Sequence, residues 1–288
     1  MFKIFTDSSA NLSEELVNKY DITVVPFTYS LDGEEYLCYE KGKEFDYRSF
    51  YDKVRAKMPL KTSMVNCNTF YDYIKPYAEK GEKVLYIGMS SGFSGTFNAG
   101  KTAIEMLKDE YKDFTAAAID SLTASYGEGL ICHYAASMRD DGVEFEQVIE
   151  KIQNIINKLR SRFICDDLFH LKRGGRISAT TALAGTVLGI KPVLRTTNDG
   201  RIETYSKARG RKTALDMLID ELKADIDKSK KQIIAMSHSD CQEDADYVLK
   251  QLKNIPTIID VLCEKMEPTT SIHVGPGGVA IFYIANEK

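Results

Sequence analysis

No stretch of this sequence is apolar over the roughly 18 residues that a membrane-spanning helix requires. The most apolar segment, residues 179–190, is short and rich in alanine, glycine and threonine. The chain opens on a strand-like segment, residues 2–5, where a signal peptide would have charged and apolar regions, so we expect no signal peptide. These absences predict a cytoplasmic protein.

Paired cysteines and clustered histidines are missing as well. The six cysteines stand singly without C-x-x-C spacing, and most have apolar or aromatic neighbours, which favours reduced thiols in the core. The four histidines are dispersed and have no carboxylate or thiolate at ligand spacing, so we predict no metal site. These histidines are His133, His170, His238 and His273.

The composition is that of an ordinary globular protein, but its charge is unevenly distributed. The 288 residues, 43% hydrophobic and 28% charged, suit one large domain or two of moderate size. The formal net charge is −4, yet residues 158–212 hold thirteen lysines and arginines against four acidic residues. This basic region favours a docking face or an anionic ligand over general nucleic-acid binding, although a solvated surface explains it equally well.

Strand-like and helix-like segments alternate along the chain, and several strands end in a turn of serine, threonine and aspartate. These turns are residues 7–9, 62–63, 90–96 and 120–123. Such alternation predicts an α/β fold with a largely parallel sheet, whose ligands bind at the carboxyl ends of the strands.

We predict two domains within this fold. Residues 1–162 form an N-terminal α/β domain with a mainly parallel sheet flanked by helices, and its last helix, residues 145–162, is the joint between the domains. Residues 163–288 form a C-terminal α/β domain with a mixed sheet that includes a hairpin around Asn198-Asp199-Gly200. We also expect a single strand over residues 22–29, and a segment over residues 271–278 that leads into the last strand.

Residues 84–97 carry a binding signal of their own. A buried strand over residues 84–89 is followed by the small-residue loop 90–96 and then by a helix. This arrangement gathers free backbone N–H groups and the positive end of a helix dipole, which suits an anion. The loop lacks residues that a P-loop, a dinucleotide fingerprint or a G-x-S-x-G elbow requires. Ser94 is therefore either a helix N-cap or part of a binding site.

Six short motifs occur in order along the whole chain. They are Thr6-Asp7-Ser8-Ser9-Ala10, Lys61-Thr62-Ser63, residues 90–96, Leu171-Lys172-Arg173-Gly174-Gly175-Arg176-Ile177, the basic residues 207–212, and His273-Val274-Gly275-Pro276-Gly277. In this order they resemble the DegV family, bacterial fatty-acid-binding proteins of the FakB type. The family often has a Gln-Pro pair after the Thr-Ser pair, where this chain has Met64-Val65.

The resemblance implies two α/β domains that hold one long-chain fatty acid, with its carboxylate between them and its tail in an apolar tunnel. It implies no cofactor and no catalytic residue, because a separate ATP-dependent fatty-acid kinase converts the bound carboxylate to an acyl-phosphate. Nucleic acid is not an expected partner, and membrane contact is at most transient. Carried over by motif, the carboxylate contacts are Thr62, Ser94, Gly95 and His273, and the kinase-facing residues are Arg173, Arg176 and Arg209.

Two other functions stay open at this point. A serine-type esterase or hydrolase using Ser94 needs a general base, for which the four histidines are the candidates. A sugar-phosphate-binding or nucleotide-binding regulator fits less well, because the phosphate-binding motifs are missing.

Overall fold

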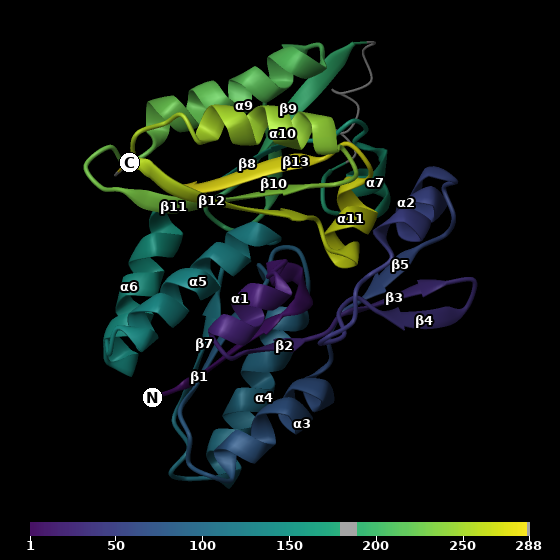
Figure 1. Cartoon of the computed structure of the whole chain (residues 1–288). Helices are drawn as coiled ribbons and strands as arrows, with labels where there is room; N and C mark the ends of the chain where they lie inside the picture. The colour runs from purple at the N-terminus through teal and green to yellow at the C-terminus, as the bar shows by residue number, and fades with distance from the viewer. Residues whose placement is uncertain (179–188, 287–288) are drawn as a thin grey trace. The chain divides into compact units, whose positions relative to one another are not determined.

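The computed structural model describes residues 1–178 and 189–286, and the chain divides into two compact units (Figure 1). Unit 1 comprises Met1–Phe45 and Pro59–Asn157, and unit 2 comprises Asp46–Met58 and Lys158–Lys288. The division into domains between residues 162 and 163 stays a prediction. No helix among the described residues is long and apolar enough to cross a membrane.

Unit 1 contains a sheet of four parallel strands in the order β2-β1-β6-β7, which confirms the predicted N-terminal parallel sheet. The strands are β1 (Lys3–Asp7), β2 (Ile22–Val25), β6 (Val84–Gly88) and β7 (Ala116–Asp120). The flanking helices are the 3-10 helix η1 (Ser8–Ala10), α1 (Glu14–Lys19), α3 (Cys67–Ala78), α4 (Thr96–Glu110), α5 (Tyr126–Asp140) and α6 (Phe145–Lys158).

Helices cover both faces of this parallel sheet. Side chains alternate between faces along a strand, so neighbours such as Phe5 and Thr6 point in opposite directions. Phe5 packs edge to face on Tyr77 of α3, whereas the Thr6 hydroxyl donates a hydrogen bond to Glu128 of α5. All five residues of β6 are buried, as the apolar sequence Val-Leu-Tyr-Ile-Gly predicts for a central strand with both faces covered.

A second sheet in unit 1 has three short antiparallel strands in the order β4-β3-β5. They are β3 (Thr28–Leu31), β4 (Glu34–Leu37) and β5 (Lys61–Ser63). The expected single strand over residues 22–29 is wrong, because the chain leaves the parallel sheet after Val25 and enters the second sheet at Thr28. Pro26, which has no N–H to give to a ladder, lies at this break.

Unit 2 contains a six-stranded sheet in the order β10-β9-β8-β13-β11-β12. β11 and β12 pair in parallel and the other neighbours are antiparallel, which confirms the predicted mixed sheet. Its strands are β8 (Leu159–Ile164), β9 (Ile190–Thr196), β10 (Ile202–Arg209), β11 (Gln232–His238), β12 (Ile258–Lys265) and β13 (Val279–Ile284).

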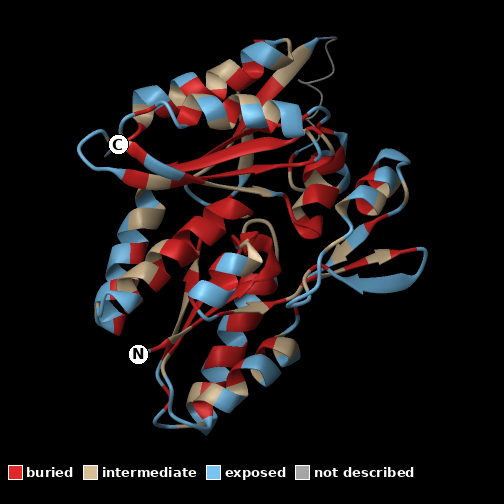
Figure 2. Cartoon of the chain, viewed as in Figure 1, coloured by how far each residue is buried: buried red, intermediate tan, exposed pale blue. Residues whose placement is uncertain are grey.

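Two long helices, α9 (Arg211–Asp225) and α10 (Gln242–Leu252), lie over one face of this sheet (Figure 1). Their apolar residues form a buried cluster with those of the strands, including Leu218 and Leu222 of α9 and Val248 of α10. Figure 2 shows the central strands of the sheet buried beneath these helices. Two shorter helices, α7 (Phe169–Arg173) and α11 (Pro268–Val274), complete the described part of unit 2 together with α2 (Tyr47–Arg55).

Helix α2 belongs to unit 2 although the chain on either side of it belongs to unit 1. Tyr51 of α2 is 1% exposed, and its hydroxyl lies 2.7 Å from the Ser271 hydroxyl of α11. Arg55 forms an ion pair with Asp240. Amphipathic spacing predicts a helix at this position but carries no information about the unit against which it packs.

Two expected elements in the second half differ from the structure. The predicted helix over residues 145–162 ends at Lys158, because residues 159–164 pair with β13 as strand β8. The segment 271–278 leads into the last strand as expected, but its first half belongs to a helix that the sequence analysis did not predict, since residues 268–274 form α11 with Pro268 in its first turn. Most of the apolar segment 179–190, where the sequence favours a helix of small residues up to about residue 188, lies outside the described residues.

Glycine at position 100 provides the space that Tyr86 of β6 occupies. A Cβ atom at Gly100 would lie 2.5 Å from Cε1 of Tyr86, which is far inside van der Waals contact. We expect Gly100→Ala to lower the free energy of unfolding by about 1–3 kcal/mol through this overpacking, as measured by urea denaturation. The exposed neighbour on the same helix supplies the control, since Lys101→Ala should change stability by less than about 0.5 kcal/mol. Equal stability of the two variants would contradict this packing.

Candidate functional site

The carboxyl ends of the parallel strands bring three of the predicted polar turns together in unit 1. The Ser90 N–H after β6 donates to the carbonyl of Thr123 at 2.8 Å, and the Ser91 N–H donates to the Asp120 carboxylate at 3.2 Å. Asp7 at the end of β1 accepts the N–H of Met89, which immediately precedes the loop after β6, at 3.1 Å. The sequence therefore predicted correctly that these turns lie close together, because the carboxyl ends of parallel strands lie at the same edge of their sheet.

Ser94 and Thr96 form the centre of the loop that leads into α4. Their hydroxyl oxygens lie 2.9 Å apart, and the Thr96 N–H donates to the Ser94 oxygen at 3.2 Å. The Thr96 oxygen also accepts the N–H of Val65 at 3.2 Å. Two hydroxyl groups carry two hydrogens, and the bond between them uses one. Because Thr96 is fully buried and Ser94 is partly exposed, the remaining hydrogen is available on Ser94 when Thr96 is the donor.

Gly95, the N-cap residue of α4, extends this donor group. Gly95 is exposed and, as a glycine, has no side chain with which to cap the helix. Among the described residues, the structure shows no partner for its N–H. Ser94 can thus be a helix N-cap and also part of a binding site. Its oxygen accepts an N–H of the first helical turn in the manner of a cap, while its hydrogen and the Gly95 N–H remain available as donors.

Thr62 lies on the edge strand β5, opposite Tyr29 of β3, and is half-buried. Two residues later the chain reaches the Ser94 loop. A Cβ atom on Gly95 would lie 3.1 Å from the Met64 sulfur, and the Val65 N–H is held by Thr96. The departure from Gln-Pro to Met64-Val65 therefore supplies a backbone donor at residue 65 that proline lacks.

Beneath this loop lies a buried polar cluster that sequence reasoning missed as a functional unit. The Asp7 carboxylate accepts the N–H of Ser9 at 3.1 Å and the N–H of Met89 at 3.1 Å, one residue before the loop begins. Glu128 of α5 accepts the hydroxyls of Thr6 and Ser9 at 2.8 and 2.6 Å. Thr6, Asp7 and Ser9 were noted as a motif, but no local signal indicated Glu128, which lies 119 positions from Ser9.

His273 lies at the end of α11 in unit 2. Glu267 caps this helix by accepting the N–H groups of Thr269 and Thr270, and a Cβ atom on Gly174 would lie 2.2 Å from Nδ1 of His273. Burial lowers the pKa of His273 to about 3, and neighbouring arginines add to this effect. The imidazole is therefore neutral near pH 7 and offers one N–H donor.

The structure brings two of the three predicted kinase-facing arginines close to His273. Arg173 and Arg176 are the charged groups that contribute most to its lowered pKa. Arg173 is exposed at the end of α7, with its guanidinium over the Phe169 ring, and Arg176 is partly buried and donates to the Gly174 carbonyl. Arg209 lies elsewhere in unit 2, exposed at the end of strand β10.

The surroundings of Ser94 do not resemble a hydrolase site. Among the described residues, the hydrogen-bond partners of its hydroxyl oxygen belong to Thr96. The single histidine of unit 1 is His133, whose ring packs on Tyr20 and Tyr134. A serine nucleophile requires a base within hydrogen-bond reach, and unit 1 does not place one there.

Thr96 supports the loop through its hydroxyl oxygen. The isosteric change Thr96→Val should lower the free energy of unfolding by about 1–3 kcal/mol, because the buried Val65 N–H would lose its acceptor. Thr102→Val on the same helix is the matched control, since the exposed Thr102 hydroxyl donates to the Asn98 carbonyl of its own helix. Denaturant unfolding of both variants measures the difference, and an equal effect of the two changes would argue against this role.

Comparison with known proteins adds an independent result. Residues 1–286 match the family model described as "Uncharacterised protein, DegV family". A DegV domain-containing protein of Clostridium perfringens is 36% identical over 287 residues, which cover 100% of this chain and 98% of that protein. The crystal structure of a fatty acid binding DegV family protein from Streptococcus agalactiae has a TM-score of 0.86 and 28% identity, covering 100% of this chain and 99% of that one.

A second solved structure gives the same result. DegV of Bacillus subtilis, described as a fatty acid binding protein, has a TM-score of 0.85 and 25% identity, and the match covers 99% of each chain. Fatty acid binding is thus a property of solved DegV proteins. The full-length matches confirm what the six motifs predicted, and this chain belongs to the DegV family.

Proposed function

We propose that this protein binds one long-chain fatty acid and that Ser94 donates a hydrogen bond to its carboxylate. The observation that carries the proposal is the hydroxyl hydrogen left over from the Ser94–Thr96 pair, beside the Gly95 N–H at the start of α4. Both are donors, and a carboxylate is an acceptor of several hydrogen bonds. Related proteins that bind fatty acids support the identity of the ligand.

Thr62 and His273 are the other proposed carboxylate contacts. Thr62 supplies a second hydroxyl on the strand next to the Ser94 loop. His273 supplies a neutral N–H from unit 2, because its lowered pKa keeps the ring uncharged near pH 7. Hydrogen bonds to an ionised group are stronger than those between neutral groups, so neutral donors are sufficient to hold a carboxylate.

The tail and the head group of the ligand contribute different amounts of binding free energy. A palmitoyl-length tail has about 14 methylenes, and their burial at roughly 0.8 kcal/mol each stabilises the complex by at most about 11 kcal/mol before the cost of association. Each hydrogen bond to the charged head group contributes about 1.5–3 kcal/mol. The tail therefore sets most of the affinity, and the head group distinguishes an acid from an alcohol.

Native mass spectrometry of the purified protein tests the ligand directly. We expect a single added mass that extraction identifies as a fatty acid. After delipidation, Ser94→Ala should weaken the binding of palmitate by about tenfold or more and leave the binding of hexadecanol unchanged, because only the acid loses a charge-assisted hydrogen bond. The exposed Ser91→Ala is the control from the same loop and should bind both as the parent does. A parent protein that stays bare after incubation with fatty acids would exclude the proposed function.

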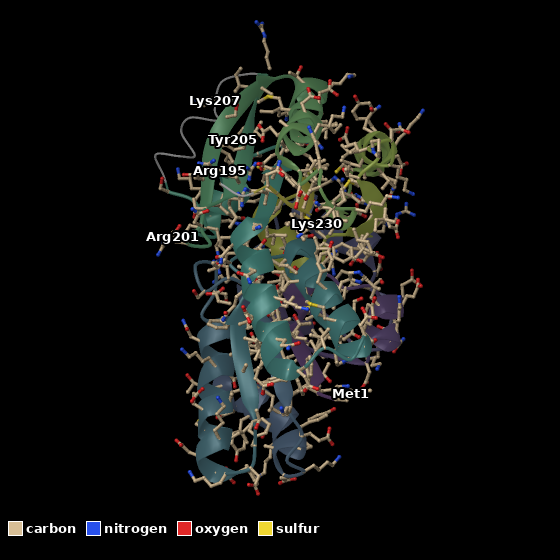
Figure 3. All side chains as sticks on the ribbon, turned by 90° about the vertical axis from the view of Figure 1, so that its left-hand side faces the viewer. Met1, Arg195, Arg201, Tyr205, Lys207 and Lys230 are labelled. Atoms are coloured by element: carbon tan, nitrogen blue, oxygen red, sulfur yellow. The ribbon has the colours of Figure 1, made fainter. Side chains whose placement is uncertain are left out.

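We further propose that the protein is a carrier, which presents the bound carboxylate to a separate ATP-dependent fatty-acid kinase. The basic composition of residues 158–212 and the exposure of Arg173 and Arg209 support a docking role for this part of unit 2. Arg195 and Lys207 lie along the β9–β10 hairpin of the same unit (Figure 3). Arg176 is assigned to the same surface, although its partial burial gives it a packing role as well.

Acyl-phosphate formation with the purified kinase of the same organism tests the docking residues. Arg173→Ala and Arg209→Ala should bind palmitate as the parent does and should lower the rate of acyl-phosphate formation, because the side chains are exposed and their charge is available to a partner. Arg201→Ala removes an exposed arginine at the far end of the hairpin and serves as the control. Loss of palmitate binding in the first two variants would place these arginines in the lipid site instead.

A further inference from the structure

Unit 2 contains an open cavity of about 610 Å³, which is lined by strands β8, β9, β10 and β13, by the turn between β9 and β10, and by the last turns of α9. All of its lining residues belong to unit 2. Among the described residues, none of those proposed for the fatty-acid carboxylate or for the kinase lines it. The cavity is therefore distinct from the sites described above.

Two arginines of neighbouring strands stand directly opposite each other in this cavity. Arg162 of β8 and Arg195 of β9 are cross-strand partners in the antiparallel ladder, so their side chains leave the sheet on the same face. Like charges in this arrangement destabilise a sheet. Arg162 is only 8% exposed, so solvent screens the repulsion poorly. An anion between the two guanidinium groups would offset this repulsion.

A β-bulge brings an aromatic ring to both arginines. The register between β10 and β9 shifts between Thr204 and Ser206, which leaves Tyr205 without a partner in the ladder. The centroid of its ring lies 5.3 Å from the guanidinium carbon of Arg162 and 5.3 Å from that of Arg195 (Figure 3). Bulges re-aim side chains in this way beside functional sites, and the face of a ring holds a planar guanidinium group in place.

Carboxylates hold only one edge of each guanidinium group. Glu203 accepts the Nε–H of Arg195 at 2.6 Å, and Glu221 accepts the Nε–H of Arg162 at 3.3 Å. In the described part of the chain, the terminal Nη groups of Arg195 have no hydrogen-bond partner. Nη2 of Arg162 lies 3.9 Å from the Asp225 carboxylate, which is beyond hydrogen-bond reach. Both arginines therefore keep terminal N–H groups for a further acceptor.

The formal charges that line the cavity cancel. They are three guanidinium groups and three carboxyl groups, on Arg160, Arg162, Arg195, Glu203, Glu221 and Asp225. Burial raises the pKa of Glu221 against the effect of Arg162 and Arg195. Each carboxyl group contacts an arginine, and the contacts among the described residues leave one oxygen of Glu203 and one of Glu221 unused. The cavity thus offers donors for an anion beside acceptors for hydroxyl groups.

We propose that this cavity binds a small, soluble phosphate monoester that carries hydroxyl groups. Its phosphate lies between Arg162 and Arg195, and its hydroxyls donate to the unused oxygens of Glu203 and Glu221. A phosphate fits better than a carboxylate, because its three terminal oxygens accept from two guanidinium groups at once, whereas one arginine satisfies both oxygens of a carboxylate. A soluble ester fits better than a lipid head group, because none of the exposed large apolar side chains of the described residues lines the cavity. The site does not depend on the proposed function.

Thermal unfolding in a phosphate-free buffer tests the site. Glucose 6-phosphate at about 10 mM should raise the melting temperature of the parent by about 2 °C, whereas glucose in sodium chloride of the same ionic strength should not. Arg195→Ala should lose most of this shift, and the variant should fold because the Arg195 side chain is 43% exposed. Arg201→Ala is the matched control and should keep the shift, because Arg201 is an exposed arginine in the turn between β9 and β10 that does not line the cavity. No shift in the parent, or an equal loss in the two variants, would overturn the proposal.

Isothermal titration calorimetry tests the hydroxyl contacts. The parent should bind glucose 6-phosphate at least about fivefold more tightly than inorganic phosphate, since only the ester extends hydroxyl groups to the two carboxyl groups. Glu203→Ala should reduce this preference, and Arg195→Ala should weaken the binding of both compounds. Equal affinities of the parent for the two compounds would overturn the proposal. Co-sedimentation with phosphatidic acid vesicles by a parent protein that does not bind the soluble ester would also overturn it.

Discussion

One buried carboxylate, that of Asp7, determines how the strand ends of unit 1 are arranged. It accepts the N–H of Ser9 within its own turn and the N–H of Met89 from the neighbouring strand β6. Backbone donors are fixed by the sheet, so they can satisfy a buried carboxyl group only where the strands place them. The loop that contains Ser94 begins one residue after Met89 and therefore takes its position from this contact. A carboxyl group buried at this position without hydrogen-bond partners would destabilise the carboxyl ends of the neighbouring strands.

The donors proposed for the ligand are neutral groups, namely hydroxyls, backbone N–H groups and an uncharged imidazole. This chemistry suits a ligand whose affinity comes chiefly from an apolar tail, since the head group then needs orientation more than a strong counter-ion. It also explains why the Ser94 loop resembles several phosphate and nucleophile motifs without matching any of them. Among the described residues, the hydrogen-bond partners of the Ser94 hydroxyl belong to Thr96, which provides hydrogen bonds but is neither a base nor a lysine.

The chain passes from unit 1 into unit 2 and back before it enters unit 2 for the second time. Helix α2 packs in unit 2 through Tyr51 and Arg55, although it lies between β4 and β5 of unit 1. β5 carries Thr62, which follows α2 by a few residues. A residue of unit 1 that is a proposed carboxylate contact therefore follows in sequence directly after a helix that packs on α11 within unit 2.

The sequence by itself determined the fold class and the family. It also determined the alternation of strands and helices that forms a parallel sheet in the first half, and the polar residues at the ends of those strands. These follow from local patterns, since an apolar strand such as β6 and the turns after it are encoded within a few residues. Only the tertiary structure decided that residues 159–162 are strand, that α2 belongs to unit 2, and that Glu128 meets Ser9. Each depends on a partner distant in sequence: β13 for residues 159–162, Ser271 for Tyr51, and a residue 119 positions away for Ser9. Periodicity is local, whereas strand pairing and buried hydrogen bonds are settled by which surfaces meet in the folded chain.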